Sequence, residues 1–335
     1  MNQTARALKV GLMLPTNEGW MAGRTARWSD LKSMAQHAEA VGFDSLWLAD
    51  HLLFEFGEPG EPPRGMWEAW SVLSALAAVT TRIELGPLVV CTSFRNPTLL
   101  AKMADTLDEI SGGRLILGLG AGYHEREYRA FGYPFDHLVG RFEEALRIVH
   151  TLLRVGEIDF RGRYYDARAC ELRPRGPRSS GPPILVGTPA RSPRMLRLTA
   201  QYADYWNGWS INQVDDRLAS ARQALDTACV KAGRDPTTLQ RTVTVLIDLP
   251  GSKKGPVAGW VQRYRSLFAP PATGSSEELA SLLGDWPGKA SAMSRSGWSR
   301  VPWRELTPSL RCSTCSIEVD QQCRTKRSFA QASPE

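Results

Sequence analysis

Two histidines in this chain stand where short apolar runs end, and a histidine can exchange a proton near neutral pH. His51 follows Asp50 directly after the apolar run at residues 43–49, and His124 follows a glycine-containing segment that begins at Gly118. A histidine beside a carboxylate can act as a general acid or base, so His51, Asp50 and His124 are candidate catalytic residues. The alternatives are structural: His51 could order the loop after its strand, and His124 could face solvent.

Glycines recur at Gly118, Gly120 and Gly122. A dinucleotide-binding fingerprint would need a further glycine where Tyr123 stands, and it would normally open the first strand–helix unit of a chain. The spacing therefore argues against a Rossmann dehydrogenase. Around Ala121 the lack of large side chains would let the backbone approach a flat ring closely, although an ordinary tight turn explains the same glycines.

Apolar runs alternate with amphipathic stretches along most of the chain, a pattern typical of β/α units around a parallel sheet. Strands are expected at residues 8–14, 43–49, 83–90, 115–119, 183–186, 205–208 and 242–247. Helices are expected at residues 28–41, 67–80, 97–110, 140–155, 195–203 and 214–232. This strict alternation favours a (β/α)8 TIM barrel, one strand short, over an open doubly wound sheet. The long insertion at residues 157–181 is expected to cover one rim of the barrel.

The composition fits one large globular domain, because 42% of the 335 residues are hydrophobic and 23% are charged. The net charge of +6 arises from interleaved basic and acidic residues, so we expect a solvated surface and no nucleic-acid partner, with an anionic small ligand as the alternative. No apolar stretch approaches the roughly 20 residues that cross a bilayer, and the first residues lack a signal-peptide core. We expect a cytoplasmic protein with free thiols, no membrane contact and no metal.

The alternation stops after residue 283. From Gly284 the chain is rich in Ser, Arg, Trp and Cys without clear periodicity, so residues 1–283 are expected to form the barrel and residues 284–335 a disordered tail. Back-translated and read one nucleotide earlier, this stretch permits a strand-like HVQVGL and a helix-like ending. We interpret the tail as the product of a frameshift that left strand 8 and helix 8 missing or replaced, which sequencing of the gene locus tests. The pair Cys312 and Cys315 is then accidental rather than a redox or zinc motif.

Three ordered motifs resemble those of the bacterial luciferase-like family of flavin-dependent oxidoreductases. They are GFDSLWLADHLL, SFRNPTLLAKMADTLDEI and SGGRLILGLGAGYHEREYRAFGYPF, and the likeness extends from about Leu8 to Ser281. The resemblance implies reduced FMN or coenzyme F420 at the carboxyl ends of the barrel strands. It also implies a small-molecule substrate and a separate flavin or F420 reductase, and it leaves room for a homodimer.

The resemblance also assigns residues to the cofactor. Its ring is expected across the mouth of the barrel, against Leu88, Val89 and Val90 after the third strand and Gly120, Ala121 and Gly122 after the fourth. Family members often hold a cis peptide behind the ring, and Leu88–Val89 is the nearest match. The phosphate is expected on the backbone at Gly187 and Thr188, with Ser192 and Arg194 heading the next helix, whose dipole favours an anion.

Three functions remain open from the sequence. In the preferred one, reduced FMN and O2 oxygenate a small organic substrate, and His51 with Asp50 is the group that moves a proton near the ring. In the second, coenzyme F420 exchanges a hydride with the substrate. In the third, the chain is a non-catalytic flavin-binding relative or the inactive product of a decayed gene.

Overall fold

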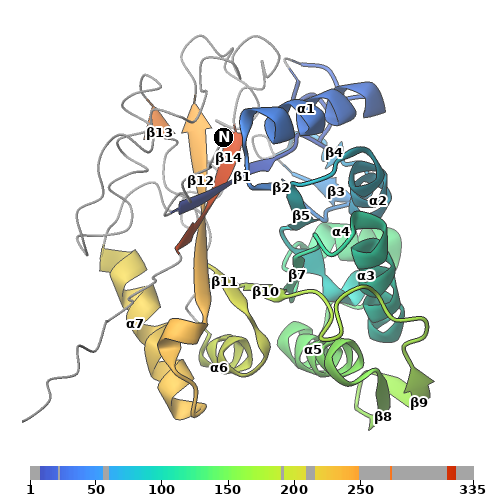
Figure 1. Ribbon diagram of the computed structural model, residues 1–335, viewed down its shortest axis with the longest axis vertical. Coiled ribbons are helices and arrows are strands. Elements are labelled where there is room, and N and C mark those ends of the chain that lie inside the picture. The colour runs from blue at the N-terminus through green and yellow to red at the C-terminus, as the bar shows by residue number, and fades with distance from the viewer. Residues whose placement is uncertain are drawn as a thin grey trace, which may run out of the picture.

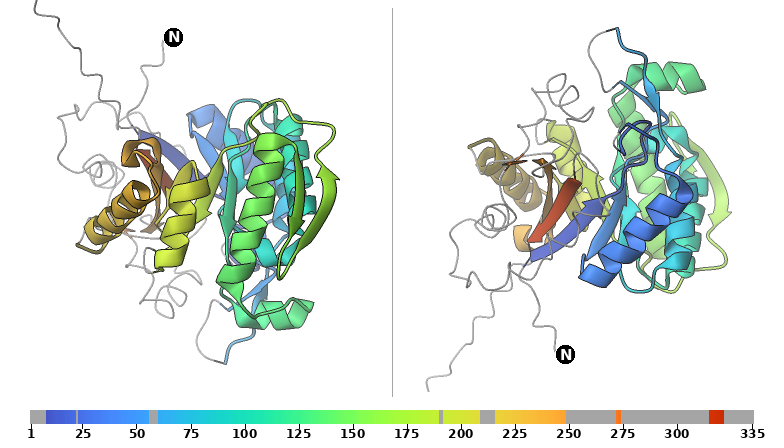
Figure 2. Two further views of the ribbon diagram at one scale, coloured as in Figure 1. Left: turned by 90° about the horizontal axis from the view of Figure 1, so that it is seen from below. Right: turned by 90° about the horizontal axis from the view of Figure 1, so that it is seen from above.

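A computed structural model describes residues 8–21, 23–55, 60–189, 192–208, 216–248, 272–273 and 315–321. Its strands form one main sheet, and helices surround the strands on the outside (Figures 1 and 2). The strands of this sheet are β1 (Leu8–Met13), β2 (Ser45–Leu48), β5 (Glu84–Pro87), β6 (Val90–Cys91), β7 (Leu117–Gly120), β10 (Ile184–Gly187), β11 (Tyr205–Asn207), β12 (Gln240–Asp248), β13 (Ala272–Thr273) and β14 (Cys315–Gln321). The helices are α1 (Trp28–Val41), α2 (Ala69–Val79), α3 (Pro97–Ser111), α4 (Glu125–Phe131), α5 (Leu138–Val155), α6 (Pro193–Tyr202) and α7 (Asp216–Lys231).

The strand order is β5-β2-β1-β14-β12-β11-β10-β7-β6, with β13 beside β12. Every neighbouring pair is parallel except the two that involve β14. The ends of this order, β5 and β6, are two halves of one expected strand, and a bridge also joins Leu85 of β5 to Leu115 beside β7. The expected α/β class with parallel strands is therefore confirmed, whereas full closure into an eight-stranded barrel stays a prediction.

The place expected for strand 8, between β12 and β1, is taken by β14 running in the opposite direction (Figure 1). Leu12 of β1 pairs with Ile317, and Val243 of β12 pairs with Val319. Within residues 284–335 the structure describes only β14, and the remainder of that segment, with Cys312, lies outside the described residues. The disordered tail and its frameshift origin stay predictions.

Local sequence signals explain where the outer helices begin and end, as α3 illustrates. The Asn96 side chain accepts a hydrogen bond from the backbone N–H of Thr98, and Pro97 occupies the first turn, where its missing N–H costs nothing. Gly112 ends the helix at φ 67°, a conformation that glycine adopts without strain. Leucines and alanines on the inner face are buried in the core, which stabilises the packed helix by about 1.5–3 kcal/mol for each leucine.

Two short hairpins and two 3-10 turns complete the described chain: β3 (Leu53–Phe54) with β4 (Arg64–Gly65), β8 (Glu157–Arg161) with β9 (Asp166–Glu171), η1 (Thr92–Phe94) and η2 (Pro236–Thr238). The β8–β9 hairpin is the core of the expected insertion. Its return segment is anchored by Arg178, whose Nε donates to the fully buried Asp108 of α3 at 2.8 Å and whose Nη2 donates to the carbonyl of Leu115. Since Leu115 lies just before β7, this segment covers the amino-terminal edge of the sheet, the rim opposite the strands' carboxyl ends.

No helix in the described part of the chain is long and apolar enough to cross a membrane.

Candidate active site

The predicted site residues follow the carboxyl ends of neighbouring parallel strands, which meet at one edge of the sheet. Asp50 and His51 follow β2, and His124 follows β7 by a few residues. Gly120 ends β7 and Gly187 ends β10, and the two strands pair directly. The structure thus brings the candidate residues from β2, β6, β7 and β10 to the same end of the strands, as the sequence predicts for β/α folds.

The peptide bond between Leu88 and Val89 is cis, as expected, and it separates β5 from β6. A Cβ placed on Gly120 would lie 2.6 Å from Cγ2 of Val89, and one placed on Gly187 would lie 2.9 Å from Cγ1. These two glycines therefore make room for the Val89 side chain, a reason that differs from the expected close approach of a flat ring.

Leu88 and Val89 are only partly buried, and they pack on an apolar cluster of Trp47 in β2, Leu185 in β10 and Ile116 just before β7. We call this pair of residues the Leu88–Val89 platform. It offers apolar surface at the carboxyl ends of the strands, which we call the mouth. This surface lies on top of side chains that fill the space between the strands.

Gly122 has φ 76°, and an added Cβ would lie 2.6 Å from Sγ of Cys91 and still closer to the hydroxyl oxygen of Tyr128. The Tyr128 hydroxyl donates to the carbonyl of Ala121 at 3.1 Å and lies 2.8 Å from the Cys91 thiol. Burial raises the pKa of the Cys91 thiol to about 12, and burial also raises the pKa of Tyr128. Both groups are neutral near pH 7. The two side chains therefore support the glycine turn by packing beneath it, and Cys91 does not act as a nucleophile.

Asp50 does not face His51. Its carboxylate accepts hydrogen bonds from Arg95 at 2.7 and 2.9 Å and from the backbone N–H of Cys91 at 3.1 Å, and its side chain is 1% exposed. Burial opposes the charge on Arg95, but the hydrogen bonds and charge of Asp50 outweigh it and raise the pKa of the guanidinium. Arg95 also donates to Glu68 at 2.6 Å. This network holds the loop after β2 against β6.

His51 is paired instead with Glu127, a residue that the sequence analysis did not single out. Nδ1 of His51 lies 2.8 Å from Oε1 of Glu127, and Oε2 of the same carboxylate accepts from the backbone N–H of Leu52 at 3.0 Å. The Glu127 side chain is 2% exposed, whereas that of His51 is 21% exposed. On the other side of the ring, Nε2 lies 3.5 Å from the hydroxyl of Tyr123.

His124 is buried rather than facing solvent, and its ring packs against Phe54 with centroids 4.7 Å apart. Its Nδ1 lies 3.8 Å from Glu127 and its Nε2 lies 3.9 Å from Glu55. The ring centroids of His124 and His51 are 6.4 Å apart. The two candidate histidines therefore share one buried carboxylate.

Several of the residues expected to bind a phosphate already form hydrogen bonds with other groups of the protein. The backbone N–H of Thr188 donates to the carbonyl of Asn207, which removes this amide as a donor to a ligand. The Ser192 hydroxyl caps α6 by accepting from the N–H of Met195 at 3.4 Å. Nε of Arg194 donates to Glu143 at 2.6 Å. Residues 190 and 191, between Thr188 and the helix, lie outside the described residues.

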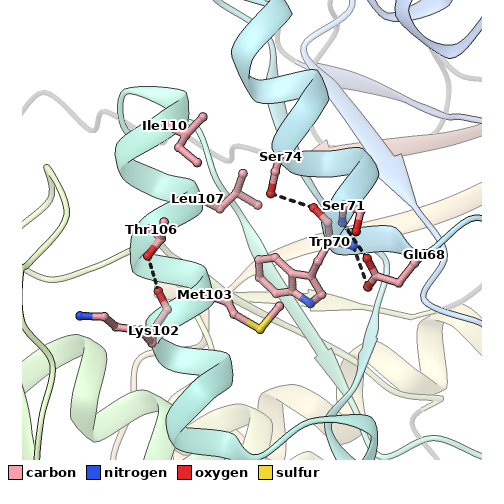
Figure 3. Close-up of a pocket in the computed structure, with 9 residues that line it drawn as sticks. All are labelled: Glu68, Trp70, Ser71, Ser74, Lys102, Met103, Thr106, Leu107 and Ile110. Carbon is pink, nitrogen blue, oxygen red and sulfur yellow. Dashed lines mark hydrogen bonds between the residues drawn. The ribbon is translucent and has the colours of Figure 1, made fainter. Parts of the chain in front are cut away.

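A groove of about 380 Å³ opens between α2 and α3 on the outside of the fold (Figure 3). In Figure 3, Trp70 of α2 and Met103 of α3 lie between the two helices. None of the predicted site residues lines this groove, although Glu68 at its edge is the residue that contacts Arg95. Over the described residues no cluster of three His, Cys, Asp or Glu side chains is arranged to bind a metal ion.

Residues 8–248 match the sequence model of the family described as luciferase-like monooxygenase. The chain belongs to this family. It is 30% identical over 291 residues to the pyrimidine monooxygenase RutA of Stutzerimonas stutzeri, covering 83% of this chain and 76% of the relative. It is 27% identical over 284 residues to a 5,10-methylenetetrahydromethanopterin reductase of Archaeoglobus fulgidus, covering 80% and 79%.

Solved structures agree with this membership at the level of the fold. An F420-dependent secondary alcohol dehydrogenase in complex with an F420–acetone adduct superposes with a TM-score of 0.67 at 16% identity, covering 90% of this chain and 98% of that chain. Because the relatives found by sequence are monooxygenases and reductases, this member of the luciferase-like family is an oxidoreductase.

Proposed function

We propose that this chain is a flavin-dependent monooxygenase that uses reduced FMN and O2 on a small organic substrate at the carboxyl ends of its parallel strands. The observation that carries the proposal is the Leu88–Val89 platform, which offers partly exposed apolar surface beside the loop of His51. A flat aromatic ring buries apolar area when it lies on such a surface. The relative with 30% identity over 83% of the chain is a monooxygenase by name, which supports the oxygenase reading.

The residues present fit a flavin. Leu88 and Val89 would lie behind the ring, with the turn from Gly120 to Gly122 beside it, and bound reduced FMN would supply the electrons that reduce O2. His51 is the residue that would move a proton at the mouth, because its ring is partly exposed while Nδ1 is held by Glu127. Asp50 would have an indirect, structural role, because it binds Arg95 and the backbone N–H of Cys91 and does not face the mouth.

The phosphate of the cofactor would lie at Gly187, Ser192 and Arg194, at the head of α6. The helix has ten residues, enough for its dipole to favour an anion at this end. Arg194 would have to contribute while remaining paired with Glu143, and the Thr188 backbone N–H is committed to the sheet.

A second candidate is hydride transfer with coenzyme F420 on the same platform. A reductase relative of similar coverage and the superposition on an F420-dependent dehydrogenase support it.

For either cofactor we propose a cytoplasmic enzyme that works with a separate flavin or F420 reductase. We also propose a homodimer, for which Leu99 and Ile110 of α3, 54% and 46% exposed, are candidate contacts that analytical ultracentrifugation of their aspartate variants would test.

Fluorescence titration of the purified full chain with FMN and, separately, with coenzyme F420 tests the proposal. Quenching of the protein's tryptophan fluorescence by reduced FMN is expected, followed by formation of an oxygenated product when O2 and a substrate are added. Tight binding of F420 alone would support hydride transfer. Val89→Arg places a charged chain on the platform and should weaken binding at least about tenfold, a loss of about 1.4 kcal/mol. Val155→Arg, at an exposed position at the end of α5, is the matched control. A folded chain that binds neither cofactor contradicts the proposal and favours a non-catalytic protein.

A further inference from the structure

The carboxylate of Glu127 contacts two nitrogen atoms in the loop after β2. One oxygen lies 2.8 Å from Nδ1 of His51, and the other accepts the backbone N–H of Leu52 at 3.0 Å. The side chain comes from α4, 76 residues further along the chain, and is almost completely buried. A buried carboxylate that is hydrogen-bonded on both oxygens has one orientation, so it fixes whatever it contacts.

The chemistry of the two groups determines the protonation of the neutral imidazole. An ionised carboxylate can only accept hydrogen bonds, so Nδ1 of His51 must carry the proton. The neutral ring then has its lone pair on Nε2, the nitrogen that faces the Tyr123 hydroxyl at the partly exposed side. Tyr123 is itself 38% exposed, so this side of the ring is the one that a ligand at the mouth can approach.

We propose that Glu127 is a positioning residue that holds His51 in the Nδ1–H tautomer, so that Nε2 is the atom that takes and returns a proton. The proton-transfer role of Nε2 rests on the proposed function, whereas the tautomer is a property of this chain without a cofactor. Asp50, the acidic neighbour of His51 in sequence, has no part in it because both of its oxygens bind Arg95.

The substitution Glu127→Gln reverses the tautomer for a geometric reason. The Leu52 N–H can only donate, so the amide oxygen of glutamine must take the place of Oε2, and the amide NH2 then faces Nδ1 of His51. Two donors cannot share a hydrogen bond, and the imidazole resolves the conflict by moving its proton to Nε2. The variant keeps the shape of the side chain while Nε2 changes from an acceptor to a donor.

The test is 15N NMR of the full chain labelled at histidine, with the His51 signals assigned by their loss in His51→Asn. At the alkaline end of a pH titration, where the imidazoles are neutral, the unmodified chain should show a protonated Nδ1 and an unprotonated Nε2. In Glu127→Gln the two should exchange. Glu125→Gln, which removes the same charge from the same turn of α4 at an exposed position paired with Arg129, should leave His51 unchanged.

An unmodified chain with the proton on Nε2 overturns the inference even if Glu127→Gln does not fold, and so does a folded variant that keeps the Nδ1–H form. If the exchange occurs but no flavin or deazaflavin binds, the tautomer assignment stands and the proposed function fails. Where the enzyme turns over, Glu127→Gln should lower kcat about 10²–10⁴-fold, the range of general acid–base catalysis, with KM little changed. An equal loss in Glu125→Gln would contradict the positioning role.

Discussion

The turn after β7 allows a quantitative test, because the chain contains two glycines with the same backbone angle and different surroundings. Gly122 and Gly132 both have φ 76°. A Cβ on Gly132, the residue that ends α4, meets no atom within 4 Å, while one on Gly122 would collide with Tyr128 and Cys91. The substitutions Gly122→Ala and Gly132→Ala therefore share the free-energy cost of backbone strain at positive φ. Only Gly122→Ala adds the cost of a steric collision.

The shared cost is that of an L-residue in the left-handed region, about 1–2 kcal/mol. The second cost applies to Gly122→Ala alone, because forcing an extra carbon into a packed site costs about 1–3 kcal/mol. We therefore expect Gly132→Ala to lower the free energy of unfolding by about 1–2 kcal/mol and Gly122→Ala by about 2–5 kcal/mol. Urea denaturation followed by tryptophan fluorescence measures both values.

A double-mutant cycle with Tyr128→Phe identifies the colliding atom. Removing the hydroxyl costs about 1 kcal/mol in the parent chain through its lost hydrogen bonds. In the Gly122→Ala background the same change relieves the collision. The double variant should therefore lose about 1 kcal/mol less free energy of unfolding than the two single variants lose together. A Gly122→Ala variant no less stable than Gly132→Ala, or strictly additive losses, would refute the steric reasoning.

Further predictions concern three buried polar groups. Asp50→Asn removes the charge that pairs with Arg95 and should cost about 3 kcal/mol or more, as urea denaturation would show, because the buried pair is broken on one side. Asp108→Asn should cost a similar amount and speed proteolysis of the segment after β9, whereas unchanged cleavage would show that the carboxylate does not anchor it. The Cys91 thiol should resist iodoacetamide at pH 8 while the half-buried Cys170 reacts, by peptide mapping. Because the folded pKa of Cys91 is raised to about 12, above an unfolded value of about 8.5, this group lowers stability as the pH rises from about 8.5 to 12.

The periodicity of apolar residues, together with the glycines and prolines at the ends of segments, predicted the regular elements well. The helix expected at residues 28–41 is α1 with the same bounds, since Gly42 ends it in the left-handed conformation. The cis peptide bond at Leu88–Val89 was predicted by resemblance alone, because nothing in local propensity indicates a cis bond between two apolar residues. The break that it makes in the third strand, which was expected to run unbroken over residues 83–90, was not predicted.

Side-chain partners were predicted less well, and Asp50 shows why. Residues that are adjacent in an extended segment point in opposite directions, so an acid next to His51 in sequence is poorly placed to serve it. The actual partner, Glu127, lies on α4, a seven-residue helix between the expected strand at residues 115–119 and the expected helix at residues 140–155, where no regular element was predicted. Only the fold brings positions 51 and 127 together.

The tail held a signal that the sequence reading missed. Ile317 and Val319 alternate with polar residues at 316, 318 and 320, which is the period of a strand. The structure pairs this segment with both β1 and β12. Its antiparallel direction could not be predicted, because backbone donors and acceptors at an open edge serve a strand of either direction.

Helix α4 also bears on how homologous chains can vary in length. Two consecutive side chains of this short helix are fixed at different places: Glu127 in the loop after β2, and Tyr128 beneath the turn at Gly122. One residue inserted between Gly122 and Glu127 would rotate the helix by about 100° and disengage both at once. Insertions and deletions among related chains should therefore be rare before α4 and common after Gly132, where the helix has already ended. A library of single-residue insertions, scored for folded protein, would reveal that boundary.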